Sequence, residues 1–118
     1  MPASAVSLSS GKSMSGVLQR NQSIVYRILV PANTSSIAVQ TRGLGNVDLY
    51  LRQGTSPLIT RFDCRSNGPT SNEFCLINRP VTGEWFVLVT SNFNSLSLYS
   101  IAASVGNSTP TFSELPGN

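Results

Sequence analysis

One pattern constrains the fold of this chain more than any other: apolar and polar residues alternate along short segments, and clusters of turn-forming residues separate these segments. In the segment 23–30, the even-numbered positions carry Ile, Tyr, Ile and Val, so an extended chain places all four on one face. A period of two residues indicates a β-strand rather than a helix. The same pattern recurs over residues 36–42, 47–52, 58–62, 74–78, 84–90 and 96–103, with a weaker candidate at 15–19.

The composition agrees with an all-β fold. Runs of Ala, Leu, Glu and Lys, which favour helices, are missing, whereas Ser, Thr, Asn, Gly and β-branched residues dominate. With 118 residues the chain is long enough for one hydrophobic core and too short for two domains. About eight short strands at this spacing predict an antiparallel β-sandwich, with a barrel as the lesser alternative.

The two ends of the chain differ from its centre, because they are polar, contain Pro and Gly, and show no alternation. We therefore expect an N-terminal linker over residues 1–10, the folded domain over 11–104, and a C-terminal linker or tail over 105–118. Residues 1–6 lack the basic and apolar regions of a secretory signal. This leaves two interpretations, a cytosolic protein or a domain cut from a longer secreted precursor.

Several classes of function are disfavoured by the residues that are missing or scattered. The chain contains no histidine, which excludes serine-hydrolase triads and zinc sites built on His. Its net charge of +3 comes from cations spread singly along the sequence, which is a weak basis for binding nucleic acid. The apolar run around Phe86–Val89 is far below the roughly 20 residues of a membrane-spanning helix. We expect no nucleic-acid partner, no membrane partner and no independent enzyme.

Two cysteines, Cys64 and Cys75, are separated by a stretch rich in turn formers. Such a stretch can fold the chain back and bring the two sulfur atoms together. A disulfide is the favoured interpretation and implies an oxidising compartment, and two free thiols in the core are the alternative.

A series of short motifs follows in a fixed order through the centre of the chain. The motifs are GNVDLYLR at 45–52, Gly54 with Ser56-Pro57, Asp63-Cys64-Arg65, Asn72-Glu73 with Cys75, and Pro80, Gly83 and Trp85-Phe86-Val87. In this order and spacing the chain resembles the bacterial pre-peptidase C-terminal domain. That family has a Gly-Asp-Ala-Asp-Leu-Tyr-Val strand, a Gly-Ser-x-Pro turn, a disulfide between Asp-Cys-Arg and Glu-x-Cys, and a Pro-x-x-Gly-x-Trp/Tyr-x-Val strand. The resemblance covers roughly residues 8–104.

The resemblance implies a non-catalytic, jelly-roll-like β-sandwich attached to the catalytic domain of a secreted peptidase, with Cys64 bonded to Cys75. The partners it implies are that catalytic domain in the precursor and a collagen-like or other insoluble polymeric substrate. Two alternative functions stay open, a secretion or maturation module that is removed from the precursor and a carbohydrate-binding module. We expect a monomer located outside the cell.

The collagenase relatives of this family bind calcium, so the resemblance raises the question of whether this chain has calcium ligands. Asn46 stands where the family has its first Asp, and no acidic N-terminal segment is present. We therefore expect no cofactor, and Asn46 and Asp48 are the only calcium candidates. The favoured alternative for Asp48 is structural: it caps turn amides or pairs with Arg52 on the same strand face.

The expected substrate-binding residues are Tyr50, Arg52 and Phe93. Alternation places Tyr50 and Arg52 on the strand face that also carries Asp48, so Tyr50 is expected to share a face with charged groups. Tyr50 is interpreted either as an exposed contact residue or as a ring that lies along the sheet and is tied to its neighbours. Phe93, in a loop of Asn and Ser, is either a plug over one end of the sandwich or an exposed anchor for substrate.

Overall fold

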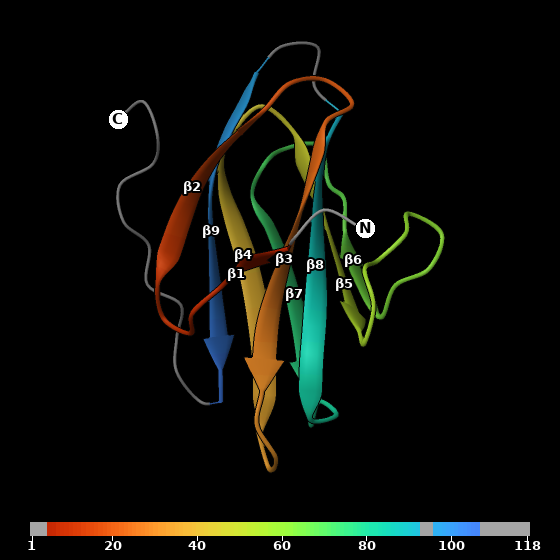
Figure 1. Cartoon of the computed structure of the whole chain (residues 1–118). Helices are drawn as coiled ribbons and strands as arrows, with labels where there is room; N and C mark the ends of the chain where they lie inside the picture. Colours follow the sequence, from red (N-terminus) through yellow and green to blue (C-terminus); the bar gives the residue numbers. More distant parts are fainter. Residues whose placement is uncertain (1–4, 93–95, 107–118) are drawn as a thin grey trace.

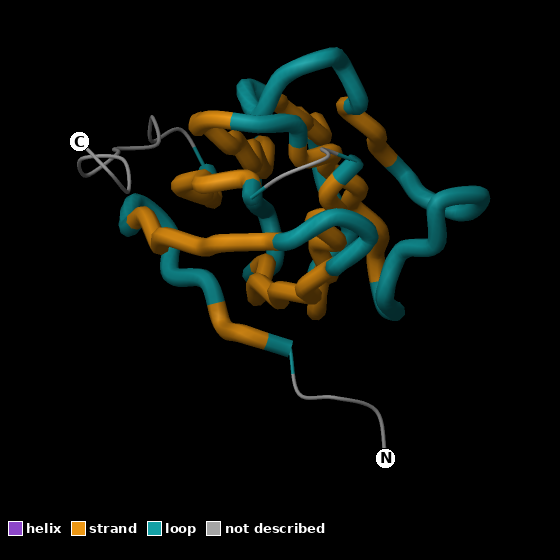
Figure 2. The backbone as a smooth tube through the Cα atoms, turned by 90° about the horizontal axis from the view of Figure 1, so that it is seen from above, coloured by secondary structure: helices purple, strands orange, loops and turns teal. Residues whose placement is uncertain are grey.

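The computed structural model describes residues 5–92 and 96–106, which form two β-sheets packed face to face (Figure 1). A five-stranded sheet has the order β1-β3-β8-β5-β6, and a four-stranded sheet has the order β2-β9-β4-β7. A view along the strands shows these two layers (Figure 2). The strands are β1 (Val6–Ser7), β2 (Ser13–Leu18), β3 (Ser23–Val30), β4 (Ser36–Leu44), β5 (Val47–Gln53), β6 (Cys64–Ser66), β7 (Glu73–Asn78), β8 (Gly83–Ser91) and β9 (Ser97–Val105).

The prediction of an all-β sandwich is confirmed. Every pair of neighbouring strands is antiparallel except β1 and β3, which are parallel. In the described residues no helix is long and apolar enough to cross a membrane. Each predicted strand except 58–62 corresponds to an observed strand.

The predicted strand at 58–62 is wrong. Leu58 and Arg61 exchange two backbone hydrogen bonds, of 2.9 and 3.0 Å, so the chain reverses direction within these four residues. The turn allows Phe62 to fold back onto the five-stranded sheet, where its ring packs against Tyr50. The segment 58–62 is therefore a turn that ends in a residue packed on the sheet, not an extended strand.

The core lies between the inner faces of the two sheets and is filled by the alternate residues that the period-two pattern identifies. Two tyrosines meet inside it, and their hydroxyl groups, Tyr26 Oη and Tyr99 Oη, are hydrogen-bonded at 2.6 Å. Trp85 is also buried, and its Nε1 donates to the carbonyl oxygen of Val81 at 2.8 Å. The side chains with no exposed surface include Ile37, Val39, Val47, Leu49, Leu51, Val87, Val89 and Ile101.

The two open sides of the sandwich are closed in different ways. On one side a disulfide joins Cys64 in β6 to Cys75 in β7, and so links the five-stranded sheet covalently to the four-stranded sheet. On the other side the N-terminal segment connects the sheets without a covalent bond. There, β1 pairs with β3, Leu8 is buried in the core, and the Gly11 amide donates to the Ala103 carbonyl at 2.8 Å.

The N-terminal segment therefore differs from the sequence expectation. The sequence places residues 6–8 in a linker, whereas the structure packs them onto the edge of β3 and into the core. A strand of two residues is too short to show alternation, which is why the pattern does not reveal it.

Candidate functional site

The outer face of the five-stranded sheet, defined here as the side facing away from the core, carries Tyr50 and Arg52, two of the three residues expected to bind substrate. Strand register sets its side chains in rows, in which Asp48 lies opposite Thr90, Tyr50 opposite Leu88, and Arg52 opposite Phe86. The next strand continues the rows, with Val25 opposite Leu88 and Arg27 opposite Phe86. Strands β5, β8 and β3 thus form one surface that mixes charged, aromatic and aliphatic side chains.

Two hollows, each of about 440 Å³, lie on this outer face. The first, which we call the polar cleft, has Asp48 and Tyr50 in its wall together with the amide side chains of Asn21, Asn67 and Asn92. The second, which we call the apolar cleft, includes Val25 and Phe86, the ion pair Arg27–Glu84 and the loop 54–56. In the ion pair, Arg27 Nη1 and Glu84 Oε2 are 3.5 Å apart and both side chains are largely exposed.

Asp48 is the charged group buried in the wall of the polar cleft, with only 3% of its surface exposed. Its Oδ2 accepts a hydrogen bond from Asn92 Nδ2, and its Oδ1 is buried without a partner in the described part of the chain. Burial, reinforced by the nearby carboxylate of Glu73 and opposed by Arg65, raises the pKa of Asp48 from 3.8 to about 6. Among the described residues Asp48 forms no ion pair with Arg52, which was one of its two structural interpretations.

This raised pKa makes a prediction about stability and pH. A carboxyl group with a higher pKa in the folded than in the unfolded state stabilises the fold below pH 3.8, and that stabilisation is lost as the pH rises through about 6. We expect Asp48→Asn to remove this fall, and to raise the free energy of unfolding at pH 7.5 by on the order of 1 kcal/mol. Urea denaturation at pH 4, 5, 6 and 7.5 measures the difference between variant and wild type.

Asp63→Asn is the matched control, because it removes a carboxylate from an exposed position outside the cleft, and the Asn side chain still offers an oxygen to the Gln53 amide that Asp63 Oδ2 binds at 2.8 Å. The fall in stability with pH should persist in that variant, because Asp48 is unchanged in it. If the free energy of unfolding changes equally with pH in wild type and in Asp48→Asn between pH 4 and 6, the pKa of Asp48 is not raised and the prediction is wrong.

Asn46 and Asp48, the two calcium candidates, have different surroundings in this structure. The hydrogen-bonding pattern directs the side-chain nitrogen of Asn46 toward the carbonyl oxygens of Gly68 and Thr70, each 3.1 Å away, so this end of the amide is a donor. Calcium takes six to eight oxygen ligands. Across residues 5–92 and 96–106, no three acidic, His or Cys side chains are grouped to hold a metal ion. Asn46 and Asp48 stay the two residues at which the expectation of no calcium is tested.

Calcium is accordingly expected to have little effect on stability. We predict that the melting temperature in 5 mM calcium chloride and that in excess chelator differ by less than about 5 °C, which corresponds to on the order of 1 kcal/mol for a domain of this length. Differential scanning calorimetry of one preparation under both conditions tests this. A larger shift would mean that calcium ligands assemble in solution, with Asp48 the first residue to substitute.

The three expected substrate-binding residues have different outcomes. Tyr50 is 6% exposed, so it is not the exposed contact residue that one of its two interpretations requires. The turn at 58–62 covers it: the Phe62 ring lies 5.7 Å away, between centroids, and Arg65 stacks on that ring at 5.2 Å. Arg52 is half-buried on the outer face. Phe93 lies outside the residues that the structure describes.

Sequence reasoning missed several residues of the outer face. Asn92 binds Asp48 across 44 residues of sequence, and Arg27 meets Glu84 across 57. Alternation does show that Val25, Arg27 and Phe86 point away from the core, so the signal for their side of the sheet was present. The order of the strands, which brings β3 and β5 to either side of β8, was not readable from periodicity.

Comparison with known proteins identifies the family. A model of the bacterial pre-peptidase C-terminal domain matches residues 22–91 of the chain, which include the three strands β3, β5 and β8 of the outer face. The chain belongs to this family. The resemblance in sequence motifs is therefore confirmed, and the chain is a non-catalytic domain of the kind that accompanies a peptidase.

Three curated proteases resemble this pre-peptidase C-terminal domain in sequence. A neutral protease of Vibrio proteolyticus is 28% identical over 100 residues, which cover 82% of this chain and 16% of the relative. The alkaline serine exoprotease A of Vibrio alginolyticus is 30% identical, with 77% and 18% covered. A virulence metalloprotease of Vibrio anguillarum is 29% identical, with 77% and 15% covered. The chain thus spans about a sixth of the length of these relatives.

Solved structures show the same fold. The pre-peptidase C-terminal domain of a collagenase from Bacillus anthracis has a TM-score of 0.70 at 15% identity, over 88% of this chain and 98% of that one. PliG of Aeromonas hydrophila, a periplasmic inhibitor of g-type lysozyme, has a TM-score of 0.69 at 16% identity, over 86% and 95%. At these identities the likeness concerns the β-sandwich alone.

Proposed function

We propose that this domain is the accessory module of an extracellular peptidase and binds polypeptide substrate along the outer face of the five-stranded sheet. The observation that carries the proposal is the presence of two hollows of about 440 Å³ on that single face, one polar and one apolar. Binding sites combine apolar surface with a few placed polar groups, and the two clefts together offer both.

The spacing of the clefts favours an extended ligand. Thr90 lines the polar cleft and Phe86 lines the apolar cleft, and both belong to β8. Four residues of a strand span about 13 Å, so a ligand that fills both clefts must be at least that long. A stretch of four residues of unfolded polypeptide has this length, whereas a single amino acid or monosaccharide does not.

The names of the relatives support a role in binding rather than in the chemical step. One relative is named a metalloprotease and another a serine exoprotease, so related domains occur in proteases of two catalytic mechanisms. A domain that serves both mechanisms acts on something common to them. The polypeptide substrate is common to them, and so is passage out of the cell, which the disulfide between Cys64 and Cys75 suits.

Carbohydrate is the second candidate ligand, and the polar cleft is the observation that favours it. Asn21, Asn67 and Asn92 offer amide groups around a buried carboxyl group, and such groups bind sugar hydroxyls as well as peptide groups. A polysaccharide would depend chiefly on the polar cleft, whereas a polypeptide with apolar side chains would use the apolar cleft too.

The test is a binding assay of the whole chain on insoluble collagen, casein aggregates, chitin and cellulose. We expect binding to the protein polymers, and a loss of about 5- to 30-fold in affinity for Arg52→Ala and for Phe86→Ala. Leu76→Ala is the control, because Leu76 is 47% exposed on the four-stranded sheet, away from the outer face. Binding to chitin or cellulose alone would favour the carbohydrate function, and binding to none of the four polymers would favour a secretion or maturation module.

A further inference from the structure

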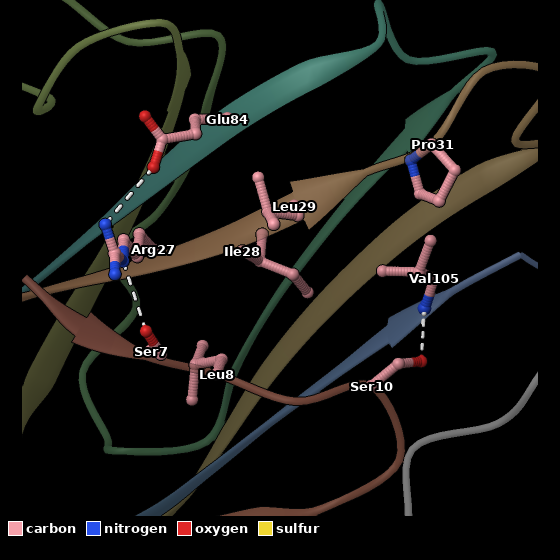
Figure 3. Close-up of a pocket in the computed structure, with 9 residues that line it drawn as sticks. All are labelled: Ser7, Leu8, Ser10, Arg27, Ile28, Leu29, Pro31, Glu84 and Val105. Carbon is pink, nitrogen blue, oxygen red and sulfur yellow. Dashed lines mark hydrogen bonds and ion pairs between the residues drawn. The ribbon is translucent and has the colours of Figure 1, made fainter.

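A third hollow, of about 370 Å³, lies at the edge of the five-stranded sheet, where β3 runs past the end of β1 (Figure 3). Its wall is mainly apolar, with Leu8, Leu29, Pro31 and Val105 around it. The ion pair Arg27–Glu84 lines both this hollow and the apolar cleft. The hollow therefore shares two lining residues with the apolar cleft of the proposed substrate-binding face.

The backbone beside this hollow is an open strand edge. The Leu8 amide donates to the Arg27 carbonyl at 2.8 Å, which shows that the backbone groups of Arg27 point toward β1. The backbone groups of successive residues in a strand point to opposite sides, so those of Leu29, two residues after Arg27, also point away from β8. Glu84, which faces Leu29 in β8, instead directs its carbonyl to the Gly54 amide at 2.9 Å.

No other strand of the described residues covers this edge at Leu29. β1 ends at Ser7, and the chain then crosses to the four-stranded sheet, where the Val105 amide donates to Ser10 Oγ at 2.8 Å. Within the described residues, no backbone hydrogen bond outside the β3–β8 ladder involves Leu29. The Leu29 side chain is 69% exposed. The site thus combines an apolar hollow with a backbone donor and an acceptor that have no partner in the part of the chain that the structure describes.

We propose that an extended polypeptide segment adds to the sheet at the edge of β3, forming backbone hydrogen bonds with Leu29 and placing an apolar side chain in the hollow. A donor and an acceptor on one residue match the spacing of peptide groups in a strand, and β-strand addition is an established mode of peptide recognition. The inference rests on the proposed function, because the ligand is the polypeptide substrate itself. Arg27 and Glu84, which line both sites, would let one chain lie along the outer face and over this edge.

The probe for this site is the soluble peptide acetyl-Thr-Val-Thr-Val-Thr-amide, added to the ¹⁵N-labelled whole chain. We expect hydrogen exchange of the Leu29 amide to slow by at least about ten-fold at saturation, because the amide gains a hydrogen bond. Leu29→Pro removes the donor without breaking the ladder to β8, since proline is tolerated where the amide faces away from the sheet. That variant should bind the peptide at least about ten-fold more weakly, whereas Leu29→Ala, which keeps the amide, should lose about three-fold at most.

An analogue of the peptide with N-methylated backbone provides the same test without changing the protein. It should fail to slow the exchange of Leu29, even if Leu29→Pro does not fold. Unchanged exchange at Leu29 with saturating peptide, or equal affinity for the methylated and unmethylated peptides, would overturn the inference. The proposed function is judged separately: loss of polymer binding in Arg52→Ala with no effect of peptide at Leu29 would leave that function standing and reject the edge site alone.

Discussion

Replacing Cys64 and Cys75 by alanine is expected to lower the free energy of unfolding by about 3 kcal/mol. The two residues are separated by 11 positions, and a cross-link over a loop of this size restricts the unfolded chain by about that amount in the chain-entropy model. The bond also joins β6 to β7, and hence one sheet to the other. Its loss should therefore open this side of the sandwich before the opposite side.

Guanidinium denaturation of wild type and double variant at one pH measures the expected difference. Wild type in excess reductant is the matched control, because it loses the cross-link and keeps both sulfur atoms in place. Hydrogen exchange should rise first for β6 and β7 in both samples. Equal unfolding midpoints with and without reductant would contradict the prediction, as would free thiols found by alkylation of the native protein.

The alternation of apolar and polar residues predicted most of this fold because it reports a local property. Whether a side chain of β3 or β8 points into the core depends only on its position in the strand, so the pattern over residues 23–30 and 84–90 was sufficient. The pairing of β3 with β8, and of β5 with β8, depends on contacts between distant segments. No local pattern contains that information.

The candidate site shows the same limit more sharply. Asp48 and Tyr50 were selected because a strand motif carries them, and both do lie on the outer face. Their surroundings come from elsewhere in the chain: Asn92 from the end of β8 and Phe62 from the turn after β5. The burial that raises the pKa of Asp48 arises from such contacts and could not be read from the strand that carries it.

The turn at 58–62 explains both why the strand predicted there is wrong and why Tyr50 is buried. A strand at 58–62 would have extended the sheet and left the Tyr50 ring uncovered. The turn between Leu58 and Arg61 instead returns Phe62 to the sheet, where it covers Tyr50. Tyr50, on the outer face of β5, is consequently as buried as the residues of that strand that face the core, although the sequence of the strand alternates.

Tyr50→Ala is therefore expected to destabilise the domain by about 3 kcal/mol or more, as truncation of a buried aromatic ring does. The ring is 6% exposed, and its removal would leave a cavity between Leu88 and Phe62. Tyr50→Phe, which keeps the packing and removes only the hydroxyl group, should cost less than about 1 kcal/mol, and Arg52→Ala should fall within about the same limit. Urea denaturation of the three variants measures these differences.

A loss below about 1 kcal/mol for Tyr50→Ala would restore the interpretation of Tyr50 as an exposed contact residue. If the large loss is found, reduced polymer binding by Tyr50→Ala reports a damaged fold, and Arg52 and Phe86 remain the side chains through which binding by the outer face can be tested.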